Sequence, residues 1–291
     1  MPDQTAKLRV VGVHGVHHYA PRRTPEQAAE SYARNWVGHL AGGLGCGAER
    51  FDLAFAYYAP ALHRGGPVVQ GDDSEELDDP LATELLAAYL AELEISAPVV
   101  QGALTIPLRQ LASAVAKRFS GTTTAFVRVF FREVATYLRA PDSPARVQAR
   151  GIVADVIKQQ EPDVVIAHSL GSVVAYEALH SLPDLRVPLL ITLGSPLALP
   201  HAVHPRLLPT PVADSTRGGK AFGVRPPGVQ RWVNIADPGD PVAIPPRLAR
   251  GFDGIGLDLS EVVHHHVGFH HAANYLSAAA TAATLAPLLG I

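Results

Sequence analysis

The chain has 291 residues, enough for one large domain or two small ones with a substantial core. With 47% hydrophobic and 18% charged residues it falls in the globular class, which excludes disordered and fibrous proteins. A net charge of -3 gives no electrostatic reason to expect nucleic acid or an anionic membrane as a partner, and the single Cys46 excludes an internal disulfide framework and a cysteine-rich metal site.

Both ends of the chain argue against export and membrane insertion. The opening "MPDQTAKLRV" lacks the long apolar region of a secretory signal. The apolar C-terminal segment "AANYLSAAATAATLAPLLG" is broken by polar residues and Pro287, so it predicts a buried closing helix instead of a membrane span. We therefore expect a soluble, cytoplasmic protein with no integral membrane segment.

The first elements predicted are a strand, a helix and a second strand. The run "LRVVGVHGV", residues 8–16, predicts a buried strand. In the helix that follows, Thr24 is a suitable N-cap, Pro25 suits the first helical position and Gln27 completes a capping box. The helix is expected to end in the glycine-rich "AGGLGCG", and "FDLAFAYY" then predicts the second strand.

Residues 60–140 differ in character from the rest of the chain. An acidic stretch, "QGDDSEELDDP", predicts a solvated linker, and helical patterns follow it at residues 81–93, 107–119 and 125–138. In the last of these, one apolar face recurs every four residues: Phe126, Phe130, Val134 and Leu138. That face fits either ordinary core packing or a helical cap over a substrate.

The rest of the chain alternates helices with buried strands. A helix is predicted at 145–160 and strands at 163–167, 187–194 and 231–237, with a Pro- and Gly-rich loop at 199–230. This alternation predicts an α/β fold, in which a mostly parallel central sheet has helices on both faces.

The stretch "VVIAHSLGSVVAYEAL" places a serine between a strand and a helix. Ser169 follows the strand directly, with the small residues Ala167 and Gly171 two positions to either side. This is the pattern of a nucleophile elbow, a tight turn that exposes a serine hydroxyl and needs small flanking residues because they come close together. The same turn leaves the backbone N–H of Leu170 at a helix start, where it can donate to an oxyanion. A structural serine in a tight turn is the alternative.

With these residues the chain resembles the serine α/β-hydrolases, in particular the lipase- and esterase-like subgroup with an Ala-x-Ser-x-Gly elbow. The resemblance implies an α/β-hydrolase core from residues 1–59 and 141–291, with residues 60–140 as a helical cap inserted before the elbow. In many relatives the cap follows the elbow instead, which weakens any transfer of substrate preference. The resemblance implies no cofactor.

The same resemblance implies a Ser-acid-His triad in that chain order. Asp240, which precedes Pro241-Val242, fits the acid better than Asp237, which can serve as a turn residue. In such relatives the base precedes the final helix in a pattern that resembles His-small-x-x-x-Tyr-Leu. Counting back from Tyr275-Leu276 indicates His270 as the base, with His271 as the alternate.

Three further histidines, 264–266, are expected to end a strand or border the substrate site. A metal site is the alternative for this histidine cluster. No His-Glu-x-x-His motif or cysteine ligand accompanies it, so we expect no metal.

The second oxyanion donor implied by the resemblance is the N–H of Val16. It follows the His14-Gly15 pair after the first strand, where a glycine lets the chain approach the substrate. A plain strand-ending glycine is the other interpretation.

Together these features predict a serine hydrolase that cleaves a small-molecule carboxylic ester or thioester with an apolar acyl part, through an acyl-enzyme. An amidase, peptidase or acyltransferase would use the same site, and a non-catalytic binding protein would use only the fold.

Overall fold

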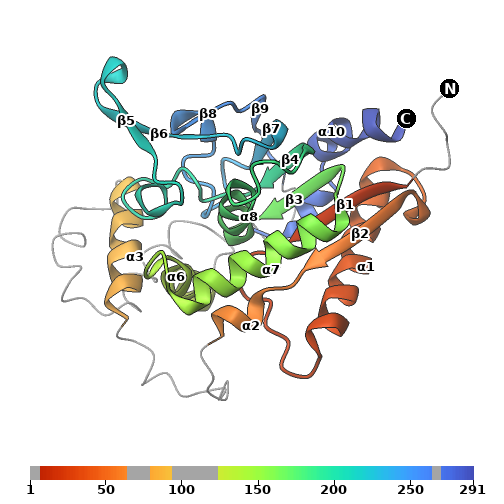
Figure 1. Ribbon diagram of the computed structural model, residues 1–291, viewed down its shortest axis with the longest axis horizontal. Coiled ribbons are helices and arrows are strands. Elements are labelled where there is room, and N and C mark those ends of the chain that lie inside the picture. Colours follow the sequence, from red (N-terminus) through yellow and green to blue (C-terminus); the bar gives the residue numbers. More distant parts are fainter. Residues whose placement is uncertain (1–6, 64–78, 94–123, 264–269) are drawn as a thin grey trace.

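A six-stranded parallel sheet forms the centre of the molecule. The computed structural model describes residues 7–63, 79–93, 124–263 and 270–291. The strand order is β2-β1-β3-β4-β7-β9, and every neighbouring pair is parallel (Figure 1). The strands are Leu8–Val13 (β1), Phe51–Ala56 (β2), Val164–His168 (β3), Val187–Leu193 (β4), Val229–Ala236 (β7) and Leu257–Ser260 (β9). The predicted parallel sheet is confirmed.

Alternation along the strands builds a core on each face of this sheet. On β3, Val164 and Ile166 belong to one buried cluster, whereas Val165 and Ala167 belong to the other. Successive side chains of a strand point to opposite faces, so an unbroken apolar run requires cover on both sides. The run "VVIA" therefore encodes a central strand.

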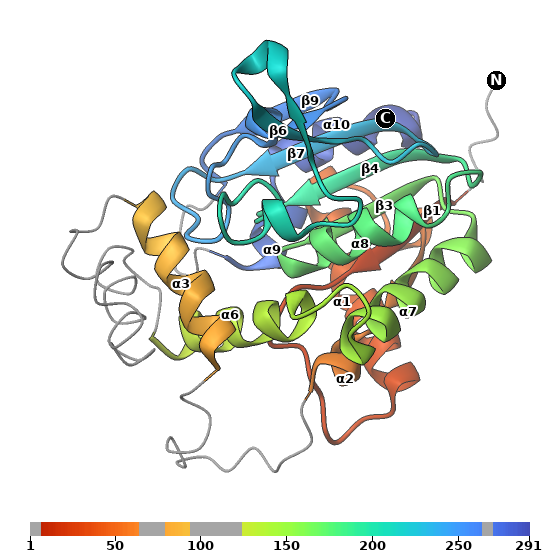
Figure 2. The same cartoon turned by 60° about the vertical axis from the view of Figure 1, so that its left-hand side comes forward.

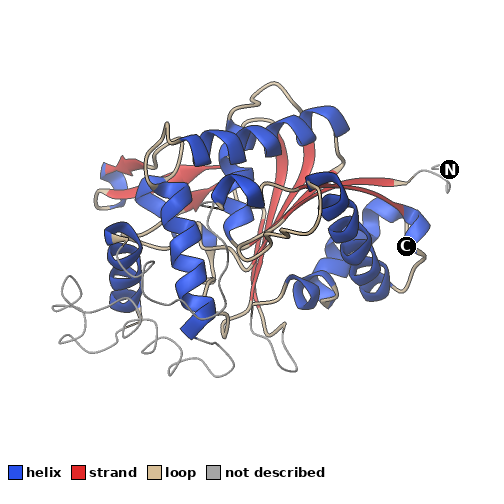
Figure 3. Ribbon diagram, turned by 90° about the horizontal axis from the view of Figure 1, so that it is seen from below, coloured by secondary structure: helices blue, strands red, loops and turns tan. Residues whose placement is uncertain are grey.

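Helices supply that cover on both faces (Figure 3). On one side, contacts join α1 to β2 and to the two C-terminal helices; these are Pro25–Leu44 (α1), Ala272–Leu276 (α9) and Ala279–Leu289 (α10). The other cluster holds Ala59–Leu62 (α2), Pro80–Glu92 (α3), Thr124–Leu138 (α6), Pro144–Gln160 (α7) and Leu170–His180 (α8). Among the described residues, every helix falls short of the length and apolarity that crossing a membrane requires.

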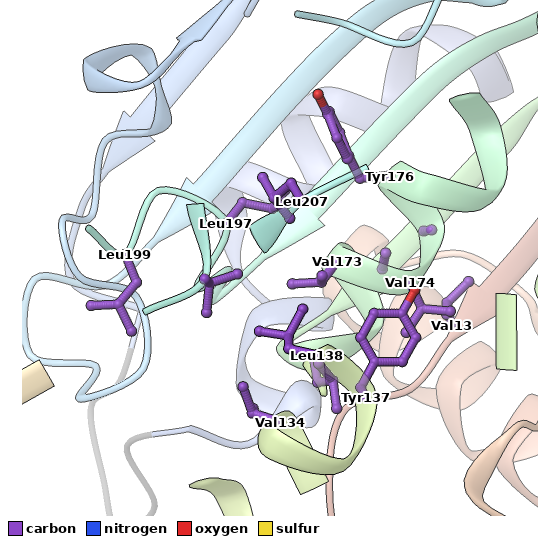
Figure 4. Close-up of a cluster of buried hydrophobic side chains, with 14 of the residues drawn as sticks. Val13, Val134, Tyr137, Leu138, Val173, Val174, Tyr176, Leu197, Leu199 and Leu207 are labelled. Carbon is purple, nitrogen blue, oxygen red and sulfur yellow. The ribbon is translucent and has the colours of Figure 1, made fainter. Parts of the chain in front are cut away.

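The apolar face of helix α6 packs into the buried cluster that also holds α7 and α8. Figure 4 shows Val134 and Leu138 of α6 beside Val173 of α8, and all three are buried. The predicted helix 107–119 and most of the acidic stretch 70–80 lie outside the described residues.

The structure departs from the sequence prediction in the segments after β4. The predicted loop 199–230 contains two strands of a small second sheet, and β9 is not among the strands predicted by residue range. The small sheet is built from Val212–Asp214 (β5), Lys220–Val224 (β6) and Phe252–Asp253 (β8), and its β5-β6 hairpin projects at the top of Figure 2. Short 3-10 helices lie at Ala48–Arg50, His204–Arg206, Ser215–Arg217 and Leu248–Arg250.

Helix ends follow the sequence in one case and depart from it in another. The side chain of Thr24 accepts from the Gln27 N–H, the reciprocal capping bond is present, and α1 ends at Gly45 in the left-handed conformation, as predicted. The single closing helix that was predicted is instead two helices, α9 and α10, separated at Ser277 and Ala278.

Candidate active site

The predicted site residues lie at one edge of the sheet. Because β1, β3, β4 and β7 are parallel, their carboxyl ends meet at a single edge. Residues 14–18 follow β1, Ser169 follows β3, Gly194 follows β4, and Asp237 and Asp240 follow β7. Segments far apart in the chain are brought together there by strand direction alone.

Ser169 forms a strained turn between β3 and α8. Its backbone has φ 57° and ψ -133°, a combination that is uncommon for a residue with a side chain. Its N–H donates to Leu193 O on β4 at 3.0 Å, which fixes the turn against the sheet. Gly171 makes the turn possible, because a Cβ there would collide with the carbonyl oxygens of Val13 and His14.

The hydroxyl of Ser169 is a buried polar group outside the hydrogen-bond network of the described residues. Its Oγ is buried, and no hydrogen-bond partner exists for it among the described residues. A buried polar group without a partner costs stability, so such groups concentrate where a ligand or a reaction uses them.

His270 and Asp240 form a hydrogen-bonded pair. The Nδ1 of His270 lies 2.7 Å from Oδ2 and 2.9 Å from Oδ1 of Asp240. A carboxylate accepts, so Nδ1 carries a proton, and in the neutral ring the lone pair is then on Nε2. That Nε2 is buried and has no partner within the described part of the chain.

The Asp240 carboxylate is held by two further donors. The Val242 N–H donates to Oδ1 at 2.8 Å and the Tyr275 hydroxyl donates to Oδ2 at 2.6 Å. Asp237 accepts from different groups, the N–H of Gly239 at 2.7 Å and the N–H of Val263 at 2.6 Å. The structure thus joins His270 to Asp240 and uses Asp237 to shape the turn after β7.

A glycine after β4 makes room for the histidine-aspartate pair, and no hydrogen bond joins Ser169 Oγ to His270 Nε2 in the described structure. Gly194, with φ 53°, directly follows Leu193, whose carbonyl accepts from Ser169. A Cβ at Gly194 would lie 2.8 Å from Asp240 Oδ2 and 3.2 Å from His270 Cε1, so a side chain there would displace the histidine-aspartate pair.

The alternate histidines are placed differently. His271 is the N-cap residue of α9 and is exposed. The three histidines at 264–266 lie outside the described residues. The part of the chain that the structure describes holds no group of three or more side chains able to bind a metal ion.

The loop after β1 lies directly against Ser169. A Cβ on Gly15 would stand 2.5 Å from Ser169 Cβ and 3.0 Å from its Oγ. Only a residue without a side chain can approach so closely.

Two histidines of this loop hold its carbonyls. His14 Nε2 accepts from the Tyr58 N–H at 3.1 Å, so its Nδ1 carries the proton and donates to Gly15 O at 2.7 Å. His18 Nδ1 lies 2.6 Å from Val16 O. Burial lowers the pKa of His18 to about 4 and that of His14 well below its usual range, which keeps both rings neutral.

The two predicted oxyanion donors are the backbone N–H groups of Val16 and Leu170. A trans peptide points its C=O and N–H in opposite directions, so the Gly15 carbonyl bound to His14 turns the Val16 N–H away from that ring. The Val16 N–H has no acceptor in the described structure, and neither has the Leu170 N–H at the start of α8. Unpaired N–H groups at a helix start favour negative charge.

Helix α6 contacts the histidine with aromatic side chains. The ring centroids of Phe126 and Phe130 lie 5.7 and 6.5 Å from that of His270. The face predicted at these positions therefore serves two purposes: it belongs to the core, and its two phenylalanines also contact the ring of His270.

Three residues near the site were not singled out by the sequence. Tyr275 was used only for counting, yet it bonds Asp240. His168, inside the elbow motif, is buried with its ring 4.6 Å from that of His270 and both nitrogens without partners in the described residues. Glu133 bonds the loop after β1 from a distance of 116 residues in the chain, which no local pattern signals.

Comparisons with known proteins add no relative to this geometry. No family model matches the chain, and neither the curated proteins nor the solved structures give a significant match.

Proposed function

We propose that the protein is a serine hydrolase with the α/β-hydrolase fold that cleaves a carboxylic ester or thioester. One observation carries the proposal: Asp240 binds Nδ1 of His270, which leaves a buried Nε2 at the sheet edge that also holds the Ser169 hydroxyl, and neither atom has a partner among the described residues. A serine hydroxyl needs such a base to become nucleophilic.

In the proposed first half-reaction, Ser169 Oγ attacks the ester carbonyl while His270 Nε2 accepts its proton. Asp240 holds the ring orientation and stabilises the imidazolium. The N–H groups of Val16 and Leu170 bind the tetrahedral oxyanion, each contributing about 3 kcal/mol to transition-state stabilisation. Collapse breaks the bond to the leaving alcohol or thiol, which takes the proton from His270.

In the second half-reaction water attacks the acyl-enzyme. His270 accepts a proton from that water and returns it to Ser169 Oγ as the carboxylic acid leaves. The apolar walls supplied by Phe126 and Phe130 support an acyl group that is itself apolar.

A fluorophosphonate probe tests the nucleophile. We expect stoichiometric labelling of Ser169 in the wild type and none in Ser169→Ala. Ser181→Ala is the matched control, because this serine caps the other end of α8 and its hydroxyl donates to the backbone carbonyl of Ala178. A folded wild-type protein that the probe does not label would contradict the proposal and favour a non-catalytic binding protein.

Model substrates test the bond and the acyl group. Turnover of p-nitrophenyl esters is expected to rise with acyl chain length, and Phe126→Ala is expected to reduce that rise. A flat response would remove the apolar acyl group from the proposal. Faster turnover of the matching anilides, or transfer of the acyl group to an added alcohol, would replace ester hydrolysis by the amidase or acyltransferase reaction.

A further inference from the structure

Helix α6 is tied to the loop after β1 through one carboxylate. Both oxygens of Glu133 accept from the backbone N–H of His17, at 3.1 and 3.2 Å. The carbonyl of the same peptide unit, Val16 O, is bound by His18 Nδ1 at 2.6 Å. The Val16–His17 peptide plane is thus held at both ends, and one of the two holding groups comes from outside the loop.

The loop needs this support because His17 is strained. Its φ of 64° lies in the left-handed region, which residues with a side chain adopt only when their surroundings hold them there. Releasing the His17 N–H would let the residue return to an ordinary conformation, which moves the neighbouring Val16 with it.

The position of Glu133 on α6 links this support to the rest of the site. Phe126, Phe130 and Glu133 are spaced four and three residues apart, which places them on one face of the helix. The two phenylalanines flank His270, while Glu133 reaches the loop that carries the Val16 N–H. One helix face therefore contacts both the proposed base and the proposed oxyanion loop.

We propose that Glu133 is a positioning residue that holds the Val16 N–H in the geometry required to bind the oxyanion, an inference that rests on the proposed function. Helix α6 then contributes to the rate of the chemical step as well as to the surroundings of His270.

The cost of keeping this carboxylate supports the inference. Burial raises the pKa of Glu133 to about 7, against the lowering effects of the His17 N–H and of Arg132. Burial raises the pKa of Tyr58 well above its usual value, and the nearby Glu133 raises it further. Groups kept at such a cost concentrate at functional sites.

Two variants separate the hydrogen bond from the charge. Glu133→Gln keeps an acceptor oxygen for the His17 N–H, and Glu133→Ala removes it. The matched control is Arg139→Gln, which removes the ion pair of Arg139, the residue directly after α6, with Asp79 at the start of α3 and does not change the loop. Each protein is assayed for p-nitrophenyl ester turnover and for amide hydrogen exchange at His17 by NMR.

We expect Glu133→Ala to lower kcat at least tenfold with KM within about twofold, because a misplaced oxyanion donor acts on the transition state; the upper bound is the 10²–10³-fold loss of a removed donor. Glu133→Gln should restore kcat to within a few-fold, and Arg139→Gln should leave it unchanged. The His17 amide should exchange faster in Glu133→Ala only.

Unchanged exchange at His17 in Glu133→Ala, or faster exchange with unchanged kcat, would overturn the inference. If the wild type neither turns over esters nor is labelled at Ser169, the proposed function fails and the catalytic part of this inference fails with it. The exchange experiment needs no activity, so it decides separately whether Glu133 holds the loop.

Discussion

The hydroxyl of Tyr275 donates to Oδ2 of Asp240 at 2.6 Å, on the oxygen that also lies nearest His270 Nδ1. It also accepts from the Asp237 N–H at 3.1 Å, so one phenol joins the turn after β7 to the first turn of α9. The orientation of the histidine therefore depends on a residue that takes no direct part in the proposed reaction.

Removing this hydroxyl should affect both stability and turnover. Tyr275→Phe leaves the buried Asp237 N–H without this acceptor, which costs about 1–3 kcal/mol of unfolding free energy. We expect kcat for a p-nitrophenyl ester to fall about tenfold, because Asp240 loses one of the donors that fix it. Denaturant unfolding and steady-state kinetics check the two effects, and an unaltered kcat would mean that Val242 alone orients the carboxylate.

The two aspartates should give opposite phenotypes. Asp240→Asn is expected to lower kcat about 10³–10⁴-fold, since the amide favours the wrong histidine tautomer. Asp237→Asn should keep kcat within about threefold while lowering the melting temperature, because its oxygens accept from the N–H groups of Gly239 and Val263. The reverse pattern would assign the acid to Asp237.

The adjacent histidines are separated in the same way. His270→Ala should reduce kcat about a thousandfold or more, as expected for a lost base. His271→Ala should stay close to wild type, because that side chain is exposed and follows the residue that contacts Asp240. Comparable losses in both variants would contradict the assignment of a single base.

Acid should destabilise the protein through the histidines of the β1 loop. The pKa of His18 is about 4 in the folded protein, below its usual 6.5, because the ring is buried. As the pH falls, the imidazole is therefore protonated in the unfolded chain before it is protonated in the folded one. The free energy of unfolding decreases between pH 6.5 and 4 as a result. From pH 7 to 4.5 the loss from His18 is about 2 kcal/mol. His14 and His168, whose pKa values are also lowered, add losses of the same sign.

The variant His18→Asn isolates this contribution, since its amide can still donate to Val16 O but does not titrate. Its unfolding free energy should fall less than that of the wild type between pH 7 and 4.5, by about the same 2 kcal/mol. Parallel pH dependence in the two proteins would show that His18 is not held neutral.

Local patterns predicted the parts of the fold that local physics determines. The apolar run of β3 and the capping box at Thr24 need no distant partner to be recognised. Strand β9 was missed because only its pairing with β7 makes a strand of a short, half-exposed segment. The break between α9 and α10 is also non-local, since a Cβ on Gly43 of α1 would lie 2.9 Å from Ser277 Cα.

The same division applies to the site. The spacing of Ala167 and Gly171 around Ser169 is a local requirement of a tight turn, so the sequence contains it. Whether Asp237 or Asp240 faces the histidine depends on how the chain after β7 meets α9. The sequence favoured Asp240 without excluding Asp237, and in the structure Nδ1 of His270 contacts Asp240.

The shared face of α6 has a consequence for protein engineering. The rings of Phe126 and Phe130 contact the ring of His270, while Glu133 accepts a hydrogen bond from the loop that contains Gly15. A chimaera that replaces residues 60–140 would exchange the aromatic contacts of His270 and the bond to the loop together. Under the proposed function, we expect a chimaera without a carboxylate at the position of Glu133 to turn over every ester more slowly.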